Sequence, residues 1–214
     1  MVDVLRATST IIVALMQGAK EIIPCAEVNT ARSFRNSHDA VLVGERHAQI
    51  IEGFDFTNSP YDLSSEDLSK KTVALTSSTG TKLLLECSGA KHILIASTLN
   101  SKSVAEEMVN IGGKWAVIGA GSHGEFRPED QVGCALVVQH YSNISEIYPD
   151  KYSQEIVDVY SENIATHIYM SSSSQKLMTL GRQCDIDFVI EKLNQYSIVP
   201  KAFLTTNDYM RITE

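Results

Sequence analysis

Three consecutive segments between residues 71 and 141 share one order of features: a short run rich in β-branched residues, a polar loop, and a stretch with helical periodicity. The runs read TVALT, HILIAS and WAVIGA, the loops SSTGT, TLNS and GSHGEFRP, and the helical stretches KLLLECSGA, KSVAEEMVNIGG and EDQVGCALVVQHY. This alternation is typical of βα units. We therefore expect an α/β fold with a largely parallel sheet.

The first residues of the chain resemble a fourth unit of this kind. DVL is typical of the end of a strand, ATSTIIVALMQGA of a helix and EIIPCAE of the next strand. The first strand would have only two or three residues, so we expect the chain to lack residues that normally precede it. In open α/β sheets the ligand binds outside the carboxyl ends of the strands, so we expect the four polar loops to meet at one site.

No long linker divides the sequence. The segments SQEIVDVYSENIATHIYM, SSQKLMTLG and IDFVIEKLNQ have helical periodicity and polar starts. We expect one domain over residues 1–214, with the C-terminal helices of residues 153–195 packed on one face of the sheet.

Composition excludes several classes of function. The 18 basic and 26 acidic residues give a net charge of -8 with no basic block, which argues against a nucleic-acid or membrane surface. The four cysteines are isolated, so we expect neither a zinc site nor a redox pair. No apolar stretch approaches the roughly 20 residues of a membrane span. We expect a cytoplasmic protein that binds any anion locally.

The stretch DVLRATST has two interpretations. A helix that begins there offers free backbone N–H groups, the hydroxyls of Thr8 and Ser9, and the guanidinium of Arg6 to a phosphate or sulfonate. Asp3, at the end of the strand, could hold a metal ion or act as a nucleophile. The alternative is that Thr8 only caps the helix while Asp3 pairs with Arg6.

Two further loops offer anion or metal ligands. Glu45 and Arg46 directly follow the strand-like AVLVG, and Glu45 is a candidate metal ligand. A turn-forming FDFTNSP supplies Asn58 and Ser59 as candidate donors to an oxyanion. In TSSTGT five hydroxyl residues surround a glycine where a helix begins, which suits an anion. An ion pair, a turn and simple helix capping are the structural alternatives for these loops.

The GAGSHG stretch matches the G-x-G-x-x-G fingerprint of dinucleotide-binding proteins. Here Arg127-Pro128 predicts a helix that begins after the glycines, and no strand with a terminal acid follows. We therefore do not expect NAD or FAD. Glu129 and Asp130, in the first turn of that helix, either favour the helix dipole or ligate a metal. His47 and His123 are candidate proton-transfer groups in polar loops.

Taken together, these stretches resemble the 2-phosphosulfolactate phosphatase (ComB) family. The matches are DVLRATSTI, GA, GER, GFDFTNSP, TSSTGT, STLN, GAGSHGEFRPED, LMTLGRQCDID and VP, in this order from residue 3 to about residue 200. The chain departs from the family pattern in its short first strand, at Thr57 where a glycine is expected, and at Thr79 where an asparagine is expected.

The resemblance implies a three-layer α/β/α sandwich with a mixed, largely parallel sheet. It also implies a Mg²⁺-dependent phosphatase that converts 2-phospho-3-sulfolactate, or a related phosphorylated hydroxy acid, to 3-sulfolactate and phosphate in coenzyme M biosynthesis. The expected partner is a small anionic phosphorylated substrate, and a homodimer is the candidate assembly.

The site residues implied by the resemblance fall into three groups. The expected catalytic residues are Asp3, Arg6 and Glu45, and the expected Mg²⁺ ligands are Asp3, Glu45, Glu129 and Asp130. The expected substrate-binding residues are Thr8, Ser9, Arg46, Asn58, Ser59, Thr79, Gly80, Thr81 and Asn100. Attack by Asp3 and attack by metal-bound water both stay open.

Two other hypotheses belong to different classes. The first is a non-catalytic binder of a phosphorylated or sulfonated metabolite, which uses the same loops without turnover. The second is a nucleotide-dependent oxidoreductase that relies on GAGSHG. Retained or titratable NAD or FAD would favour the oxidoreductase.

Overall fold

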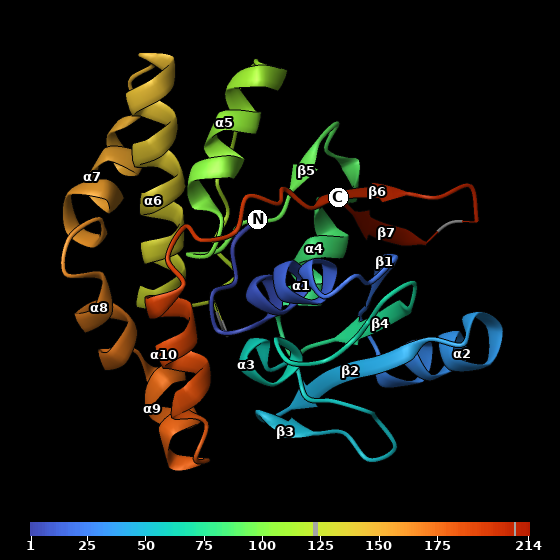
Figure 1. The fold of residues 1–214 in the computed structure, drawn as a ribbon. Helices are drawn as coiled ribbons and strands as arrows, with labels where there is room; N and C mark the ends of the chain where they lie inside the picture. The colour runs from blue at the N-terminus through green and yellow to red at the C-terminus, as the bar shows by residue number, and fades with distance from the viewer. Residues whose placement is uncertain (122–123, 208) are drawn as a thin grey trace.

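The computed structural model describes residues 1–121, 124–207 and 209–214, and a mixed sheet of seven strands forms the centre of this part of the chain (Figure 1). The strand order is β3-β2-β4-β1-β7-β6-β5. The strands are β1 (Glu21–Cys25), β2 (Val41–Arg46), β3 (Gln49–Ile50), β4 (Thr72–Thr76), β5 (Ile93–Leu94), β6 (Lys201–Leu204) and β7 (Met210–Thr213).

The expected α/β class with a mixed sheet flanked by helices is confirmed, but parallel pairing between the named strands is limited to the centre of the sheet. There β4 pairs in parallel with β1 on one side and with β2 on the other. The remaining pairs between the named strands of the described residues are antiparallel. Three of these pairs involve the hairpin β6–β7, which lies between β1 and β5 and which the sequence pattern did not predict, and the fourth joins β2 to β3.

The chain start lies between two segments that the βα pattern marks as strands. Val2 forms single parallel bridges to Ala96 and to Gly119. Its N–H donates to the carbonyl of Ile118 at 2.8 Å, and its own carbonyl accepts from Ala120 at 2.8 Å. The expected strand WAVIGA is reduced to this bridge, because its segment pairs with only one or two residues of the chain start.

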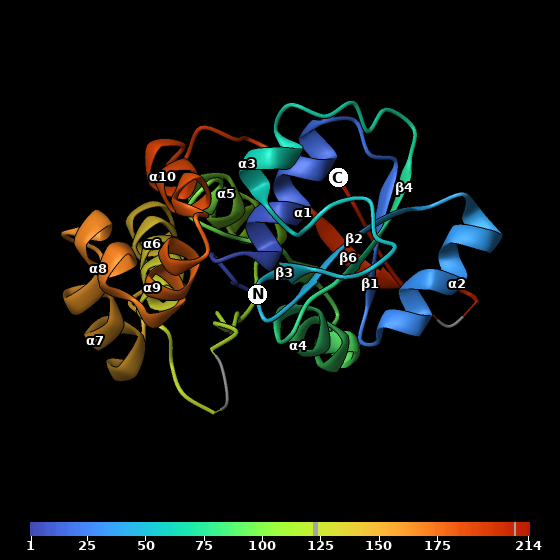
Figure 2. The same cartoon turned by 90° about the horizontal axis from the view of Figure 1, so that it is seen from below.

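Helices cover both faces of the sheet, with α1 and α3 on one side and α2 and α4 on the other, while α5 to α10 gather beside it (Figure 2). They are α1 (Ala7–Met16), α2 (Val28–His38), α3 (Pro60–Leu63), α4 (Gly80–Glu86), the 3-10 helix η1 (Cys87–Gly89), α5 (Ser101–Ile111), α6 (Pro128–Ser145), α7 (Lys151–Tyr160), α8 (Ile164–Met170), α9 (Ser172–Thr179) and α10 (Gln183–Glu191).

Local signals set several of these helix boundaries. Pro128 occupies the first turn of α6, after an extended Arg127, as the sequence predicts. Side-chain oxygens of Asp150 and Ser171 accept backbone N–H bonds at the starts of α7 and α9. The predicted helix of SQEIVDVYSENIATHIYM is divided into α7 and α8, because Asn163 takes a left-handed conformation with φ of 50°.

The apolar residues form two clusters, one on each face of the central strands. In β1, Ile22 belongs to the larger cluster and Ile23 to the smaller one beneath α2, as expected for side chains that alternate along a strand. Nine of the ten residues of α1 are buried. The helices α7 to α10 contact α6, α3 and one another. No helix in the described ranges has the length and apolar character required to cross a bilayer.

Candidate active site

A cavity of about 300 Å³ lies where the residues after Val2, the ends of β2 and β4, and the start of α6 come together. Four predicted acids line it: Asp3, Glu45, Glu129 and Asp130. Four other predicted site residues also line it: Arg6, Asn58, Thr79 and Gly80. Three of the four polar loops expected to meet, DVLRATST, SSTGT and GSHGEFRP, therefore line one cavity, whereas TLNS does not.

Backbone N–H groups fix the carboxylates of two of these acids. The two oxygens of Asp130 accept from Val4 at 2.8 Å and from Gly121 at 3.1 Å. The two oxygens of Glu45 accept from Ser78 at 2.7 Å and from Ala48 at 2.8 Å. These bonds tie the walls of the cavity together and leave the other two acids less compensated.

Asp3 and Glu129 carry the uncompensated negative charge of the cavity. One oxygen of Asp3 accepts from the N–H of Ala7 at 3.0 Å, while Oε2 of the buried Glu129 has no hydrogen-bond partner among the described residues. Burial, together with the charges of Glu129 and Glu45, raises the pKa of Asp3 to about 6. Burial and the charge of Asp3 raise the pKa of Asp130 as well. An arrangement of this kind favours the binding of a cation.

The carboxylates of the cavity suit a Mg²⁺ ion that keeps several water ligands better than a metal ion that is bound by protein side chains alone. Within the described ranges, no three His, Cys, Asp or Glu side chains are arranged closely enough to hold a metal ion. Magnesium commonly uses one or two carboxylates and fills its other positions with water and substrate phosphate. Glu129 fits that pattern, because its buried and unpartnered carboxylate oxygen points to a missing positive charge, and Asp3 lines the same cavity.

Arg6 supplies a positive group to the same cavity. Its Nη1 donates to Oδ2 of Asp185 at 2.8 Å, and both side chains are almost completely buried. Its Nη2 is buried and has no partner among the described residues. A guanidinium can bind two oxygens side by side, so the free Nη2 is a ready donor to a phosphoryl oxygen in the cavity.

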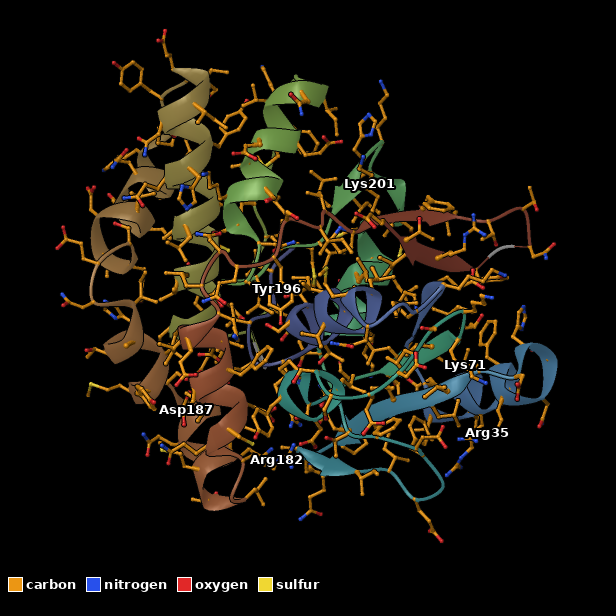
Figure 3. All side chains as sticks on the ribbon, in the orientation of Figure 1. Arg35, Lys71, Arg182, Asp187, Tyr196 and Lys201 are labelled. Atoms are coloured by element: carbon orange, nitrogen blue, oxygen red, sulfur yellow. The ribbon has the colours of Figure 1, made fainter. Side chains whose placement is uncertain are left out.

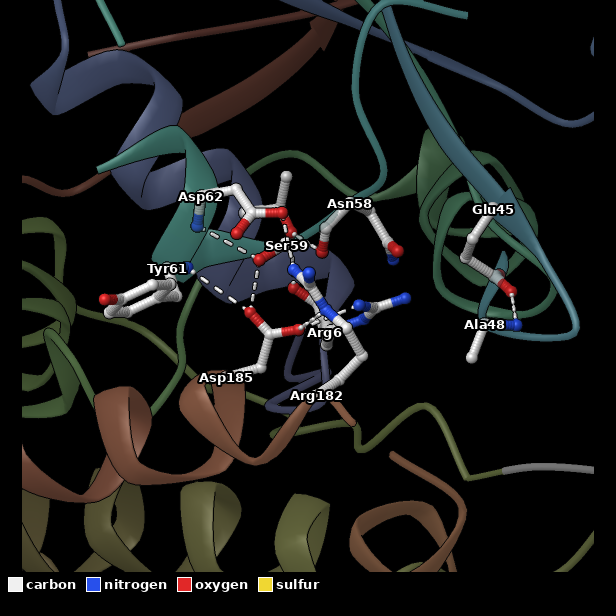
Figure 4. Close-up of polar contacts among 10 residues, drawn as sticks. Arg6, Glu45, Ala48, Asn58, Ser59, Tyr61, Asp62, Arg182 and Asp185 are labelled. Carbon is white, nitrogen blue, oxygen red and sulfur yellow. Dashed lines mark hydrogen bonds and ion pairs between the residues drawn. The ribbon is translucent and has the colours of Figure 1, made fainter. Parts of the chain in front are cut away.

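Asp185, at the start of α10, is the centre of a buried polar network (Figure 4). Its Oδ1 accepts a short bond from the hydroxyl of Ser59 and a 3.4 Å bond from the N–H of Tyr61. Arg182 extends from the same region toward α3, where its Nη2 contacts Asp62 at 2.5 Å (Figure 3). The network therefore connects α10, α3 and the loop that carries Asn58.

Gly80 is required by close packing against the acid cluster. A Cβ atom at this position would lie 2.1 Å from Oδ2 of Asp3 and 2.7 Å from Cβ of Ala7. The side chain of Thr79, the residue before α4, makes no capping hydrogen bond. Gly80 thus leaves room for the carboxylate of Asp3, and the hydroxyl of Thr79 does not cap the helix.

A family model described as 2-phosphosulpholactate phosphatase matches residues 1–203 of the chain. The chain belongs to this family. A probable 2-phosphosulfolactate phosphatase of Clostridium tetani (strain Massachusetts / E88) is 34% identical over 203 residues, which cover 94% of this chain and 87% of the relative. The corresponding protein of Clostridium beijerinckii is 32% identical over 206 residues, 94% of this chain and 86% of the relative.

A relative from a genus other than Clostridium shows a similar likeness. The probable 2-phosphosulfolactate phosphatase of Caldanaerobacter subterraneus subsp. tengcongensis is 31% identical over 206 residues, and these cover 94% of this chain and 85% of the relative. The chain therefore matches most of the length of these family members, and the family model covers all the residues that line the cavity.

Several of the predicted substrate-binding residues of this family member serve the backbone and do not line the cavity. The hydroxyl of Thr8 donates to the carbonyl of Asp3 at 2.7 Å, and that of Ser9 donates to the carbonyl of Val4 at 2.8 Å. Thr81 accepts from the N–H of Ser77 at 3.1 Å. These hydroxyls fix the loops around the cavity, which corresponds to the structural alternative for both segments.

Arg46 and Asn100 also lie outside the cavity lining. Arg46 donates to the carbonyl of Glu45 at 2.7 Å and to the hydroxyl of Thr76 at 3.1 Å. The completely buried Asn100 bonds the N–H of Ser97 and the carbonyls of Ile95 and Ile198. The hydroxyl of Ser59 is likewise occupied, because it accepts from the N–H of Asp62 and donates to the carboxylate of Asp185.

The glycine motif has a structural function at the site. The helix α6 begins at Pro128, after GAGSHG, whereas a dinucleotide-binding motif has its helix begin within the glycines. Gly121, with φ of 58°, directs its N–H to Asp130. His47 is exposed in the β2–β3 turn, and His123 lies outside the described residues.

No single sequence motif indicates three of the charged residues at the site. Arg127 and Lys176 line the cavity, and Asp185 holds Arg6. Arg127 immediately precedes the predicted helix start at Pro128. Asp185 belongs to LMTLGRQCDID, one of the segments that resemble the family. Lys176 lies on an ordinary amphipathic helix, and nothing local to its sequence indicates a site.

Proposed function

We propose that this family member is a Mg²⁺-dependent phosphatase that hydrolyses 2-phospho-3-sulfolactate, or a related small phosphorylated hydroxy acid. The products are 3-sulfolactate, or the corresponding hydroxy acid, and inorganic phosphate. One observation carries this proposal: the buried, uncompensated carboxylates Asp3 and Glu129 line the same cavity as the free Nη2 of Arg6. The names of the relatives support the choice of substrate.

Asp3 and Glu129 would hold the metal ion, and the backbone-bound Glu45 and Asp130 would fix the walls around it. When bound, Mg²⁺ supplies charge stabilisation to the transferring phosphoryl group and polarises its oxygens. Such stabilisation matters because hydrolysis of a phosphate monoester is among the slowest uncatalysed reactions.

Arg6 would orient the substrate. Its Nη1 is occupied by Asp185, so only Nη2 is available to donate to a phosphoryl oxygen. Asn58 lines the same cavity, and its amide N–H groups would donate to substrate oxygens. The Thr79 hydroxyl is free of capping and can donate to a substrate oxygen. These groups would hold the ester in one orientation for in-line displacement.

Two routes of attack are compatible with this arrangement. In the covalent route a carboxylate oxygen of Asp3 bonds to phosphorus, the bond from phosphorus to the ester oxygen breaks, and water then hydrolyses the acyl phosphate. In the direct route a water molecule attacks phosphorus and Asp3 only binds the metal. A single turnover in ¹⁸O-labelled water selects the covalent route if the label appears in Asp3, because only attack of water on the acyl carbon puts a labelled oxygen into its carboxylate.

The reaction itself is tested by phosphate release from 2-phospho-3-sulfolactate, 2-phospholactate and p-nitrophenyl phosphate, with Mg²⁺ and with EDTA. We expect Mg²⁺-dependent release, fastest from the sulfonated substrate. Thermal stabilisation by 2-phospho-3-sulfolactate without release from any ester would replace this proposal with the non-catalytic binder. Sedimentation of the same preparation tests the homodimer, which stays a prediction.

A further inference from the structure

Two cationic side chains besides Arg6 line the cavity, and the proposed binding of metal and phosphate does not use them. Arg127 is the residue before α6, and Lys176 lies on α9. Both line the cavity, and neither forms an ion pair within the part of the chain that the structure describes. The other arginine of the lining, Arg6, forms an ion pair with Asp185 through its Nη1.

Arg127 is held in place by a specific contact. Its Nη1 donates a short bond to the hydroxyl of Ser172, the first residue of α9. Its Nε is buried and has no hydrogen-bond partner among the described residues. This contact joins the start of α6 to the start of α9, so that Arg127 and Lys176 reach the cavity from adjoining elements. A buried guanidinium nitrogen without an acceptor is costly unless a ligand supplies one.

We propose that Arg127 and Lys176 form a second anion subsite, which binds the carboxylate or sulfonate part of the substrate while Arg6 and the metal bind its phosphate. This inference rests on the proposed function and adds to it the source of substrate selectivity. A small phosphate ester with a further acid group places two or three negative charges within a few bonds of each other. The two unpaired cations match this chemistry, whereas a neutral alcohol portion would leave them unused.

Selectivity between two esters tests the subsite. We expect Arg127→Gln and Lys176→Gln each to lower kcat/KM for 2-phospho-3-sulfolactate roughly tenfold or more, since each removes a charge-assisted contact. For p-nitrophenyl phosphate, which has no second acid group, kcat/KM should change less than about threefold. Lys151→Gln is the matched control, because Lys151 is an exposed lysine on α7. Equal losses on both esters, or none on either, would overturn the proposal.

A binding measurement keeps this test separate from that of the proposed function. 3-Sulfolactate carries the carboxylate and the sulfonate but no phosphate, so it probes the subsite directly. We expect it to raise the Tm of the wild-type protein and of Lys151→Gln, and not that of Arg127→Gln/Lys176→Gln. If the wild type hydrolyses no ester, the proposed function fails, but this Tm difference still decides the subsite. Equal stabilisation of wild type and double variant would contradict it.

Discussion

Nη1 of Arg6 donates to Oδ2 of Asp185 at 2.8 Å, and the two residues are 179 positions apart in the sequence. The pair is buried on both sides, with side-chain exposures of 3% and 0%. Arg6 follows the first residues of the sheet, whereas Asp185 lies on α10 in the helical group beside it. The orientation of the arginine in the cavity therefore depends on the correct docking of α10.

We expect Asp185→Asn to lower phosphatase activity strongly while the protein still folds. Removing one partner of a buried ion pair costs about 3–5 kcal/mol of stability, and it frees Arg6 to leave its orientation toward the cavity. The effect on kcat/KM should be tenfold or more, measured well below Tm with circular dichroism as a check of folding. Glu191→Gln, at the exposed end of α10, is the control.

A double-mutant cycle identifies the cause of that loss. If Asp185 acts through Arg6, the combination of Arg6→Gln with Asp185→Asn should cost little more activity than Arg6→Gln alone. Additive losses would mean that Asp185 affects activity by another path.

Asp3→Asn should stabilise the metal-free protein at pH 7.5. The pKa of Asp3 is about 6 in the folded state against 3.8 for an ordinary aspartate, so the folded state binds more protons between these values. The resulting stability is fully present below pH 3.8 and is lost as the pH rises through 6. At pH 7.5 the charged form costs up to about 3 kcal/mol.

The measurement is Tm in EDTA at pH 7.5 and pH 4. We expect Asp3→Asn to raise Tm by several degrees at pH 7.5, and the difference to shrink toward zero at pH 4, where Asp3 is largely protonated. A decrease of similar size at both values would show that the Asp3 carboxylate is structurally required and not a buried charge that awaits a cation.

Mg²⁺ should stabilise the wild-type protein at neutral pH through Asp3 and Glu129. A ligand at 100 times its Kd adds about 2.7 kcal/mol to the free energy of unfolding. We expect Glu129→Gln to reduce the Mg²⁺-dependent shift in Tm, while Glu106→Gln, exposed on α5, retains it. A shift that is equal in both variants would place the metal elsewhere.

Gly80→Ala should abolish most activity. The added Cβ would lie 2.1 Å from Oδ2 of Asp3, so either the carboxylate or the start of α4 must move. Displacement by such a distance is sufficient to lose roughly 100-fold in rate. Gly89→Ala is the control, because a Cβ there meets no atom within 4 Å. Unchanged kcat/KM in Gly80→Ala would contradict the placement of Asp3 in the reaction.

The sequence predicts those parts of the fold that depend on local signals. The run TVALT coincides with β4, and Pro128 marks the start of α6, because β-branched periodicity and proline act over a few residues. The hairpin β6–β7 was not predicted. Only one residue of β6 is buried, so its alternation of polar and apolar residues is weak, and its place beside β1 is set by tertiary packing.

The same division holds for the site. Asp3 follows the bridged Val2 and Glu45 lies at the end of β2, so the rule that ligands bind at strand ends identifies them from sequence. Asp185, Arg127 and Lys176 approach the cavity from the helical group or its edge, and only the three-dimensional structure brings them there. Asn100 is the opposite case, a residue after a strand segment that does not reach the site. Its amide donates instead to the buried carbonyls of Ile95 and Ile198.

The most direct test of a metal-dependent phosphatase site in this cavity is phosphate release from 2-phospho-3-sulfolactate by wild type and Asp3→Asn, each with Mg²⁺ and with EDTA. We expect release only by the wild type and only with Mg²⁺. Equal release in EDTA, or full activity of folded Asp3→Asn, would contradict the assignment of a metal-dependent phosphatase site to this cavity.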